Sequence, residues 1–194
     1  MVEENPTVKS TSEFRIAVSG HRYISTDEQI VKRVRSLVTK MVNDHTEKTI
    51  YLLSALAEGG DQLVAAIAAE LPKIKIIVPL PMPREDYLTD FISDRGRERF
   101  RVMITQVSEV IDLPPVENRN AAYRQLGNYL VDHCDCLIAI WNGEFNHEDG
   151  GTGEVVAAAK SSKKPIYWVY CENEKAGVKN PLHGTKEIGE IKIF

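Results

Sequence analysis

The chain has 194 residues and a net charge of −4, which argues against general nucleic-acid binding, because a phosphate-tracking surface carries a basic excess. Hydrophobic residues make up 43 % and charged residues 27 % of the chain, an ordinary globular composition that supports a core without disulfides or structural metals. No apolar run approaches about 18 residues and the first residues do not resemble a secretory leader, so we expect a cytoplasmic protein with no membrane segment.

Apolar runs alternate with amphipathic stretches along the first half of the chain. Residues 1–12 lack periodicity and are predicted to form a flexible arm, whereas 13–194 are predicted to form one domain. The apolar positions between Ile30 and Val42 recur at helical spacing. Strands are predicted at 14–19, 49–56 and 74–81, and a second helix at 61–72.

The second half continues the alternation less regularly at first. Helices are expected near 96–107, 118–133 and 151–164, and strands near 108–114, 134–141 and 165–170, with an edge strand at 190–194. The odd cysteine count indicates reduced thiols, and the C-x-C spacing of Cys134 and Cys136 is not that of a zinc site. We therefore expect no metal site, and no residue pattern calls for a resident cofactor.

This order of elements predicts the fold class. A strand–helix–strand–helix–strand sequence implies right-handed crossovers and a parallel sheet. We predict a three-layer, Rossmann-like, doubly wound α/β fold, with helices on both faces of a mainly parallel sheet. Ligands of such sheets bind at the carboxyl ends of the strands, where the strand order reverses.

The turn at 150–153 has the features of a phosphate-binding loop. Gly150, Gly151, Thr152 and Gly153 lie between an apolar strand and a helix. Glycines let backbone N–H groups approach a ligand, and the helix start adds unpaired N–H groups and the positive end of the dipole. The alternative is a flexible glycine turn without a ligand.

Two other strands end in similar turns. After the second predicted strand, Gly59 and Gly60 are expected to line a phosphate or ribose. Glu58 and Asp61 are candidates to accept hydrogen bonds from ribose hydroxyls, and helix capping is the alternative for Asp61.

The first predicted strand ends in Ser19, Gly20, His21 and Arg22. Arg22 is suited to bidentate contacts with phosphate, and His21 to hydrogen bonding or stacking. Ordinary surface positions are the alternative for both residues. Together the three turns predict one nucleotide-sized pocket.

Glu154 is the candidate catalytic carboxylate. It follows the glycine turn directly, where it can act as a base or nucleophile at an anomeric carbon, or only complement the helix dipole. Trp141 is a candidate to stack on a base, or a half-buried core residue. Tyr87, Asp90 and Phe91 are candidates for a lid.

Tyr123 lies near the start of the helix predicted at 118–133. It is expected near the ligand edge of the sheet if that helix begins there.

The motifs SGHR, SALAEGGD and CLIAIWNGEFNHEDGGTGE, followed by VVAAAKSSKKPI, resemble in this order the SLOG superfamily of Rossmann-like domains. The resemblance covers roughly residues 14–171. The superfamily includes the LOG ("lysine decarboxylase-like") proteins, the DNA-processing protein DprA and the N-terminal domains of TRPM channels. The strongest likeness is to the prokaryotic TRPM-type group.

The resemblance implies a fold that binds nucleotides or their derivatives, such as NAD- or ADP-ribose-type signals in prokaryotic conflict systems, and it favours a homodimer. LOG enzymes are phosphoribohydrolases with the motif P-G-G-x-G-T-x-x-E. Here Asp149 replaces its proline, Gly150, Gly151 and Gly153 match, Glu154 falls on its threonine, and Ala157 falls on its glutamate. Nucleoside deoxyribosyltransferases carry G-T-A-x-E-x-G, and the segment 151–154 is one residue shorter than that spacing.

The sequence therefore predicts a domain that binds a nucleotide-derived small molecule, as a ligand sensor in signalling or defence, with an effector protein as a further partner. One alternative is an N-glycoside hydrolase, phosphoribohydrolase or ribosyltransferase acting through Glu154. Another is DprA-like binding of single-stranded DNA, which the negative charge disfavours.

Overall fold

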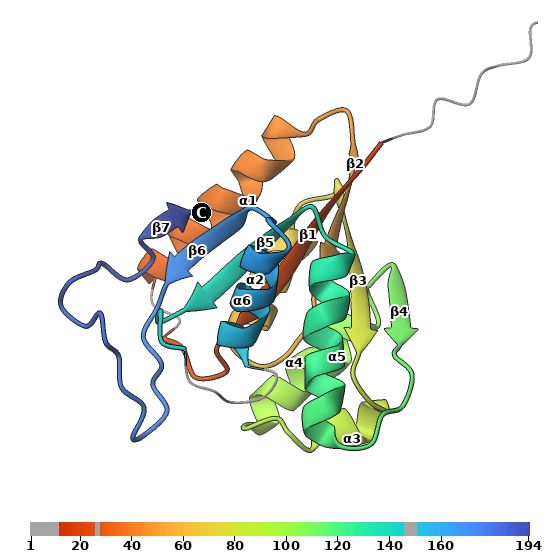
Figure 1. Ribbon diagram of the computed structural model, residues 1–194. Coiled ribbons are helices and arrows are strands. Elements are labelled where there is room, and N and C mark those ends of the chain that lie inside the picture. The colour runs from red at the N-terminus through yellow and green to blue at the C-terminus, as the bar shows by residue number, and fades with distance from the viewer. Residues whose placement is uncertain (1–11, 26–27, 146–150) are drawn as a thin grey trace, which may run out of the picture.

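The computed structural model describes residues 12–25, 28–145 and 151–194 (Figure 1). Seven strands form one sheet in the order β4-β3-β2-β1-β5-β6-β7. All neighbouring pairs are parallel except β6 and β7, which are antiparallel. The strands are β1 (Glu13–Gly20), β2 (Thr49–Leu53), β3 (Ile74–Leu80), β4 (Glu109–Asp112), β5 (Cys136–Trp141), β6 (Ile166–Tyr170) and β7 (Ile191–Ile193).

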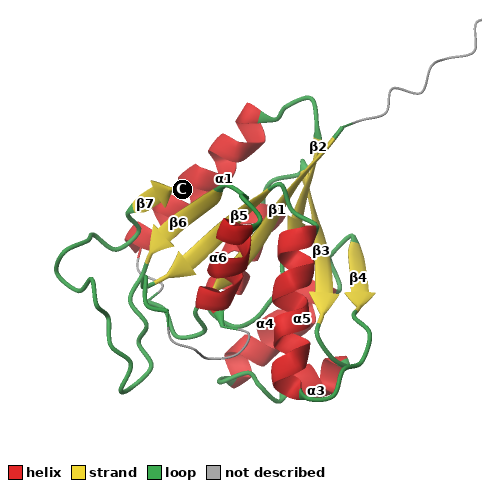
Figure 2. Ribbon diagram, in the orientation of Figure 1, coloured by secondary structure: helices red, strands yellow, loops and turns green. Residues whose placement is uncertain are grey.

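Helices cover both faces of this sheet. The pairs α1–α2 and α5–α6 lie on opposite faces, and the short helix α3 lies beyond the end of β3 (Figures 1 and 2). The long helix α1 shows the apolar stripe of such a covering helix: it buries Ile30, Val34, Leu37, Val38, Met41 and Val42. The helices are α1 (Glu28–Asp44), α2 (Gly60–Ala69), α3 (Arg84–Leu88), α4 (Asp94–Ile104), α5 (Arg119–Asp132) and α6 (Thr152–Ser161).

The predicted three-layer, Rossmann-like α/β fold is confirmed by this arrangement. The second strand is shorter than expected, because the chain turns after Leu53. There the Ser54 hydroxyl accepts the N–H of Leu56 (3.2 Å), and Leu56 has a φ of 55°. The sequence pattern did not indicate α3, a helix of five residues.

The strand order reverses between β1 and β5. From β1 the chain adds β2, β3 and β4 on one side, and then returns to place β5, β6 and β7 on the other. β1 and β5 run side by side to their carboxyl ends, where Gly20 pairs with Ile140. These ends define the place where a ligand of such a sheet binds. No helix in the described part of the chain is long and apolar enough to cross a membrane.

Candidate functional site

A cleft of about 690 Å³ lies at the carboxyl edge of the sheet where the strand order reverses. Its volume is within the range of small-molecule sites. Among the predicted site residues, those that line it come from three distant segments: Ser19, Gly20, His21, Arg22, Asp61, Gly151 and Thr152. Other side chains that line the cleft include Tyr23, which follows Arg22, and Tyr87, Asp90, Asn120, Tyr123, Asn173 and Lys175 from further segments.

The N-terminus of α2 packs directly on the turn that follows β1. The N–H of Gly60 donates to the carbonyl of His21 (3.0 Å). A Cβ on Gly59, whose φ is 92°, would lie 2.2 Å from the same carbonyl oxygen, and a Cβ on Gly20 would lie 2.8 Å from the Cα of Gly60. Gly59 and Gly60 therefore allow two chain segments to touch, and neither of them is among the residues that line the cleft.

Asp61 stabilises the contact between the start of α2 and the turn after β1. Its buried carboxyl group accepts the N–H of Gly20 (3.0 Å) and lies 3.4 Å from the Ser54 hydroxyl, which donates to it. Burial raises the pKa of Asp61 to about 7, against the lowering effect of these hydrogen bonds. Asp61 therefore takes up a proton at a higher pH than an exposed aspartate does.

His21 connects the turn after β1 to the segment after β6 through hydrogen bonds of Asn142. The Nε2 atom of His21 lies 3.0 Å from the side-chain oxygen of Asn142. The side-chain nitrogen Nδ2 of Asn142 donates to the side-chain oxygen of Asn180 and to the backbone carbonyl of Lys179 (both 3.2 Å). These contacts orient His21 toward the fold, although it remains in the lining of the cleft.

Arg22 supplies a half-buried cation to the cleft wall. It donates from Nη1 to the backbone carbonyl of Asp90 (3.0 Å), and its guanidinium lies 5.3 Å from the centre of the Tyr123 ring. The Asp90 carboxylate accepts hydrogen bonds from Arg119 (2.6 Å) and from the Tyr123 hydroxyl. α5 does begin at this edge, so the condition under which Tyr123 was expected here is met.

α6 begins at the opposite wall. Gly151 is its N-cap residue, in extended conformation (φ −77°, ψ 167°) and without a side-chain cap, and Thr152 is its first helical residue. The first-turn amides and the positive end of the helix dipole therefore lie beside the cleft, an arrangement that favours anions.

Two predicted ligand residues have structural roles instead. Glu58 accepts hydrogen bonds from the N–H groups of Ile92 (2.6 Å) and Ser93 (3.2 Å) and from the Ser93 hydroxyl, and so supports the start of α4. Trp141 is buried against Phe145 and Trp168, and is not among the described residues that line the cleft.

The end of the glycine turn also departs from the expected arrangement. Gly153 faces Glu144 and Phe145. Glu154 lines a small hollow between α5 and α6, together with Arg124 and Asn128, rather than the cleft. Its catalytic role stays a prediction that this position does not favour. Gly150 lies outside the described residues.

Several polar residues of the cleft were not predicted from the sequence. Asn120 belongs to the first turn of α5, where an N-terminal position at the ligand edge was the available signal. Asn173 and Lys175 come from an irregular polar segment after β6, which carries no periodic signal. The N–H of Glu174 donates to the carbonyl of Tyr23 (2.9 Å), and this bond brings the segment to the cleft rim.

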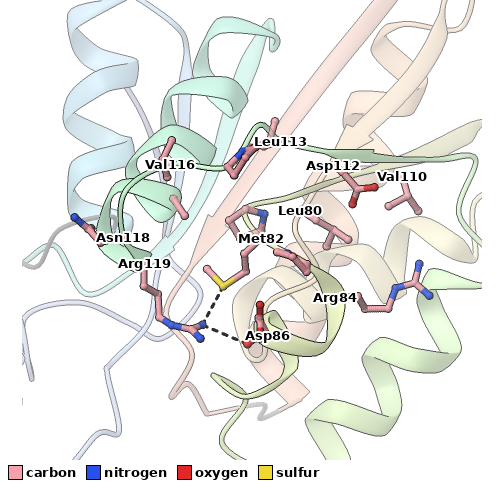
Figure 3. A pocket seen from close by; sticks show the side chains of 14 residues that line it. Leu80, Met82, Arg84, Asp86, Val110, Asp112, Leu113, Val116, Asn118 and Arg119 are labelled. Atoms are coloured by element: carbon pink, nitrogen blue, oxygen red, sulfur yellow. Dashed lines mark hydrogen bonds between the residues drawn. The ribbon is translucent and has the colours of Figure 1, made fainter.

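A second cavity, of about 810 Å³, lies at the carboxyl ends of β3 and β4 (Figure 3). Its wall is mainly apolar, and Arg119 crosses it to contact the sulfur of Met82 (2.9 Å) and the carbonyl of Asp86 (3.3 Å). Because Arg119 also pairs with Asp90, the two cavities share a wall at this ion pair. No group of three or more metal-ligating side chains occurs among the described residues.

Comparison with solved structures supports the fold. DNA processing protein A from Helicobacter pylori, whose structure was determined for its single-stranded DNA binding mode, is 14 % identical, and the match covers 89 % of this chain and 72 % of that chain with a TM-score of 0.55. The molybdenum cofactor carrier protein from Chlamydomonas reinhardtii is 20 % identical over 80 % of this chain and 75 % of that chain, with a TM-score of 0.48. No protein-family model and no curated protein sequence matches the chain. The likeness to DNA processing protein A supports the Rossmann-like α/β fold and, at this identity, the fold alone.

Proposed function

We propose that the chain binds a nucleotide-derived small molecule in the cleft between the ends of β1 and β5, and that it acts as a ligand sensor. The observation that carries this proposal is the convergence of 19–22, Asp61 and 151–152 on one cleft at the strand-order reversal. These segments are far apart in the sequence, and α/β folds of this kind bind ligands at that place.

The chemistry of the cleft fits a ligand with a phosphate and a polar, ring-containing part. Arg22 and the N-terminus of α6 provide positive charge for the phosphate. Tyr23 and Tyr123 provide aromatic surface, and Asn120 and Asn173 provide amide groups for ribose or base. ADP-ribose and NAD, which the resemblance to TRPM-type SLOG domains suggests, combine these parts.

Matched ligands and matched arginine variants test this proposal. We expect ADP-ribose, NAD or AMP to raise the thermal midpoint of unfolding, and adenosine to have a weaker effect. Arg22→Ala should lose most of the affinity for the phosphate-bearing ligands, and Arg22→Lys only part of it, in isothermal titration. Arg84→Ala, which removes an exposed arginine outside the cleft, is the control. Equal losses for adenosine and AMP in Arg22→Ala would contradict the role of Arg22.

The same incubations decide between sensing and catalysis. A sensor leaves NAD and nucleoside monophosphates intact, whereas the alternative, an N-glycosidase or ribosyltransferase, releases free base that chromatography detects. Release that is lost in Glu154→Ala would assign the catalytic role to Glu154 and overturn the sensor proposal.

DNA binding like that of DNA processing protein A is disfavoured by the charge of the cleft. The lining contains two basic residues, Arg22 and Lys175, and two acidic residues, Asp61 and Asp90. It therefore lacks the continuous positive charge that binds the phosphates of a single strand. Affinity for oligonucleotides with a steep salt dependence would reverse this conclusion.

We also propose, from the resemblance to the TRPM-type group, that the chain forms a homodimer and acts on an effector protein. Sedimentation of the chain with and without ADP-ribose tests the first, and mass spectrometry of what co-purifies tests both partner and ligand.

A further inference from the structure

The hydroxyl group of Tyr87 is an unpartnered polar group in the cleft wall. Tyr87 is 1 % exposed and lines the cleft, and its hydroxyl oxygen is buried with no hydrogen-bond partner among the described residues. Its ring is fixed by edge-on contacts with Phe91 (centroids 5.3 Å apart) and Phe100 (5.8 Å). The hydroxyl group therefore cannot turn away to solvent without disrupting this aromatic cluster.

A buried hydroxyl without a partner is unfavourable, and phenylalanine would fill the same space without that penalty. The carboxyl groups of Asp61 and Asp90 line the same cleft, and neither accepts a hydrogen bond from Tyr87. The Asp90 carboxylate instead accepts hydrogen bonds from the side chains of Arg119 and Tyr123. The Asp61 carboxyl group accepts them from the N–H of Gly20 and the hydroxyl of Ser54. The described part of the chain therefore supplies no hydrogen-bond acceptor for this hydroxyl.

The charge next to Tyr87 indicates the class of acceptor. Arg22 and Tyr87 line the same cleft and both lie against Tyr123: the Arg22 guanidinium is 5.3 Å and the Tyr87 ring centroid 6.3 Å from the centre of the Tyr123 ring. Burial raises the pKa of Tyr87 well above its ordinary value, so the group is a donor throughout the physiological pH range. A neutral donor beside a fixed guanidinium suits an oxyanion, which accepts from both at once.

We infer that Tyr87 and Arg22 together bind the phosphate group of the ligand, with the Tyr87 hydroxyl donating to one phosphate oxygen. This inference rests on the proposed function. It places the phosphate against α3 and the turn after β1, with the first-turn amides of α6 facing it from the other wall of the cleft. The shared chemistry is a phosphate oxygen, and its source is either a nucleotide or inorganic phosphate.

The test is Tyr87→Phe, which removes one oxygen atom and keeps the ring packing. We expect the thermal midpoint of unfolding to stay the same or rise, while the affinity for ADP-ribose and AMP falls about tenfold, as for the loss of a hydrogen bond to a charged group. Adenosine, which lacks the phosphate, should bind both proteins equally. Tyr170→Phe is the matched control, because Tyr170 is also buried with an unpartnered hydroxyl but is not among the cleft residues.

Further measurements identify the source of the phosphate and distinguish failure of this inference from failure of the proposed function. Inorganic phosphate that competes with AMP in wild type and loses affinity in Tyr87→Phe supports a subsite for free phosphate as well. Unchanged AMP affinity in Tyr87→Phe, or an equal loss for adenosine, overturns the inference and leaves the proposed function standing. Wild-type protein that binds none of the phosphate-bearing probes overturns the proposed function and this inference with it.

Discussion

The glycine turns after β2 and after β5 look alike in sequence but differ in the structure. Gly59 and Gly60 are pressed against the carbonyl groups of the turn after β1, and the N-terminal amides of α2 bind the chain itself. Gly151 lies at the cleft, and α6 begins there without a side-chain cap. One turn is closed by protein and the other faces the candidate ligand site.

The difference shows that a glycine pair indicates the close approach of a backbone, and does not indicate what approaches it. In the closed turn the approaching group is the carbonyl of His21, whose oxygen accepts the N–H of Gly60. The closed turn still matters for the site, because it holds 19–22 in place through Asp61. It positions Arg22, and the open turn lines the opposite wall.

The largest expected effect comes from Gly59→Ala. The new Cβ would collide with two carbonyl oxygens, 2.2 Å and 2.5 Å away, at a φ of 92°. We expect the free energy of unfolding to fall by about 4 kcal/mol or more, as for other severe backbone conflicts. Urea unfolding followed by circular dichroism measures it.

Gly177→Ala is the matched control for that substitution. Gly177 has a similar φ of 82°, but no atom of the described residues lies within 4 Å of a Cβ placed on it. It should therefore lose only about 1 kcal/mol, from backbone strain alone. If both variants lost the same amount, the collision in the closed turn would not be the cause.

The next largest effect concerns pH. The pKa of Asp61 is about 7 in the folded chain and ordinary in the unfolded chain, so between about pH 4 and 7 the folded chain holds the extra proton. Stability is therefore greatest below this window and falls as the pH rises through it, by up to about 4 kcal/mol. Above about pH 8 both states are ionised and the loss is complete.

Asp61→Asn isolates this contribution from that of other titrating groups. The amide oxygen can still accept the N–H of Gly20, and the side chain never ionises. Relative to wild type, this variant should gain stability steadily from pH 4.5 to 8 in urea unfolding. Parallel stability curves for the two proteins would show that Asp61 keeps an ordinary pKa.

A moderate effect is expected from Glu58→Ala. Glu58 precedes the closed turn, and its carboxylate accepts hydrogen bonds from the N–H groups of Ile92 and Ser93 at the start of α4. Its loss should lower stability by about 1–2 kcal/mol, as for a missing helix cap, and leave ligand affinity unchanged. Weaker binding of ADP-ribose at unchanged stability would restore the ribose-binding role that the sequence suggested.

The sequence predicted the fold well because its strands are buried apolar runs separated by amphipathic helices, and this pattern is local. It also predicted which strand ends meet, because parallel strands share one carboxyl edge. It failed where a role depends on a distant contact. Glu58 meets α4, Gly59 meets His21 and Glu154 faces the hollow beside α5, and none of these contacts has a local signal. Asn173 and Lys175 reach the cleft from an irregular segment for the same reason.

The smallest effect on stability, and the sharpest contrast with Gly59, is expected from Gly151→Ser. Gly151 has an extended conformation that any residue adopts, and serine at an N-cap accepts a first-turn N–H. Stability should therefore stay within about 0.5 kcal/mol of wild type. The new side chain occupies the first-turn amides that are proposed to face the phosphate, so the affinity for AMP should fall several-fold while adenosine binding changes less. Unchanged AMP affinity would mean that the open turn, like the closed one, serves the fold alone, and that the phosphate is held from the Arg22 side of the cleft.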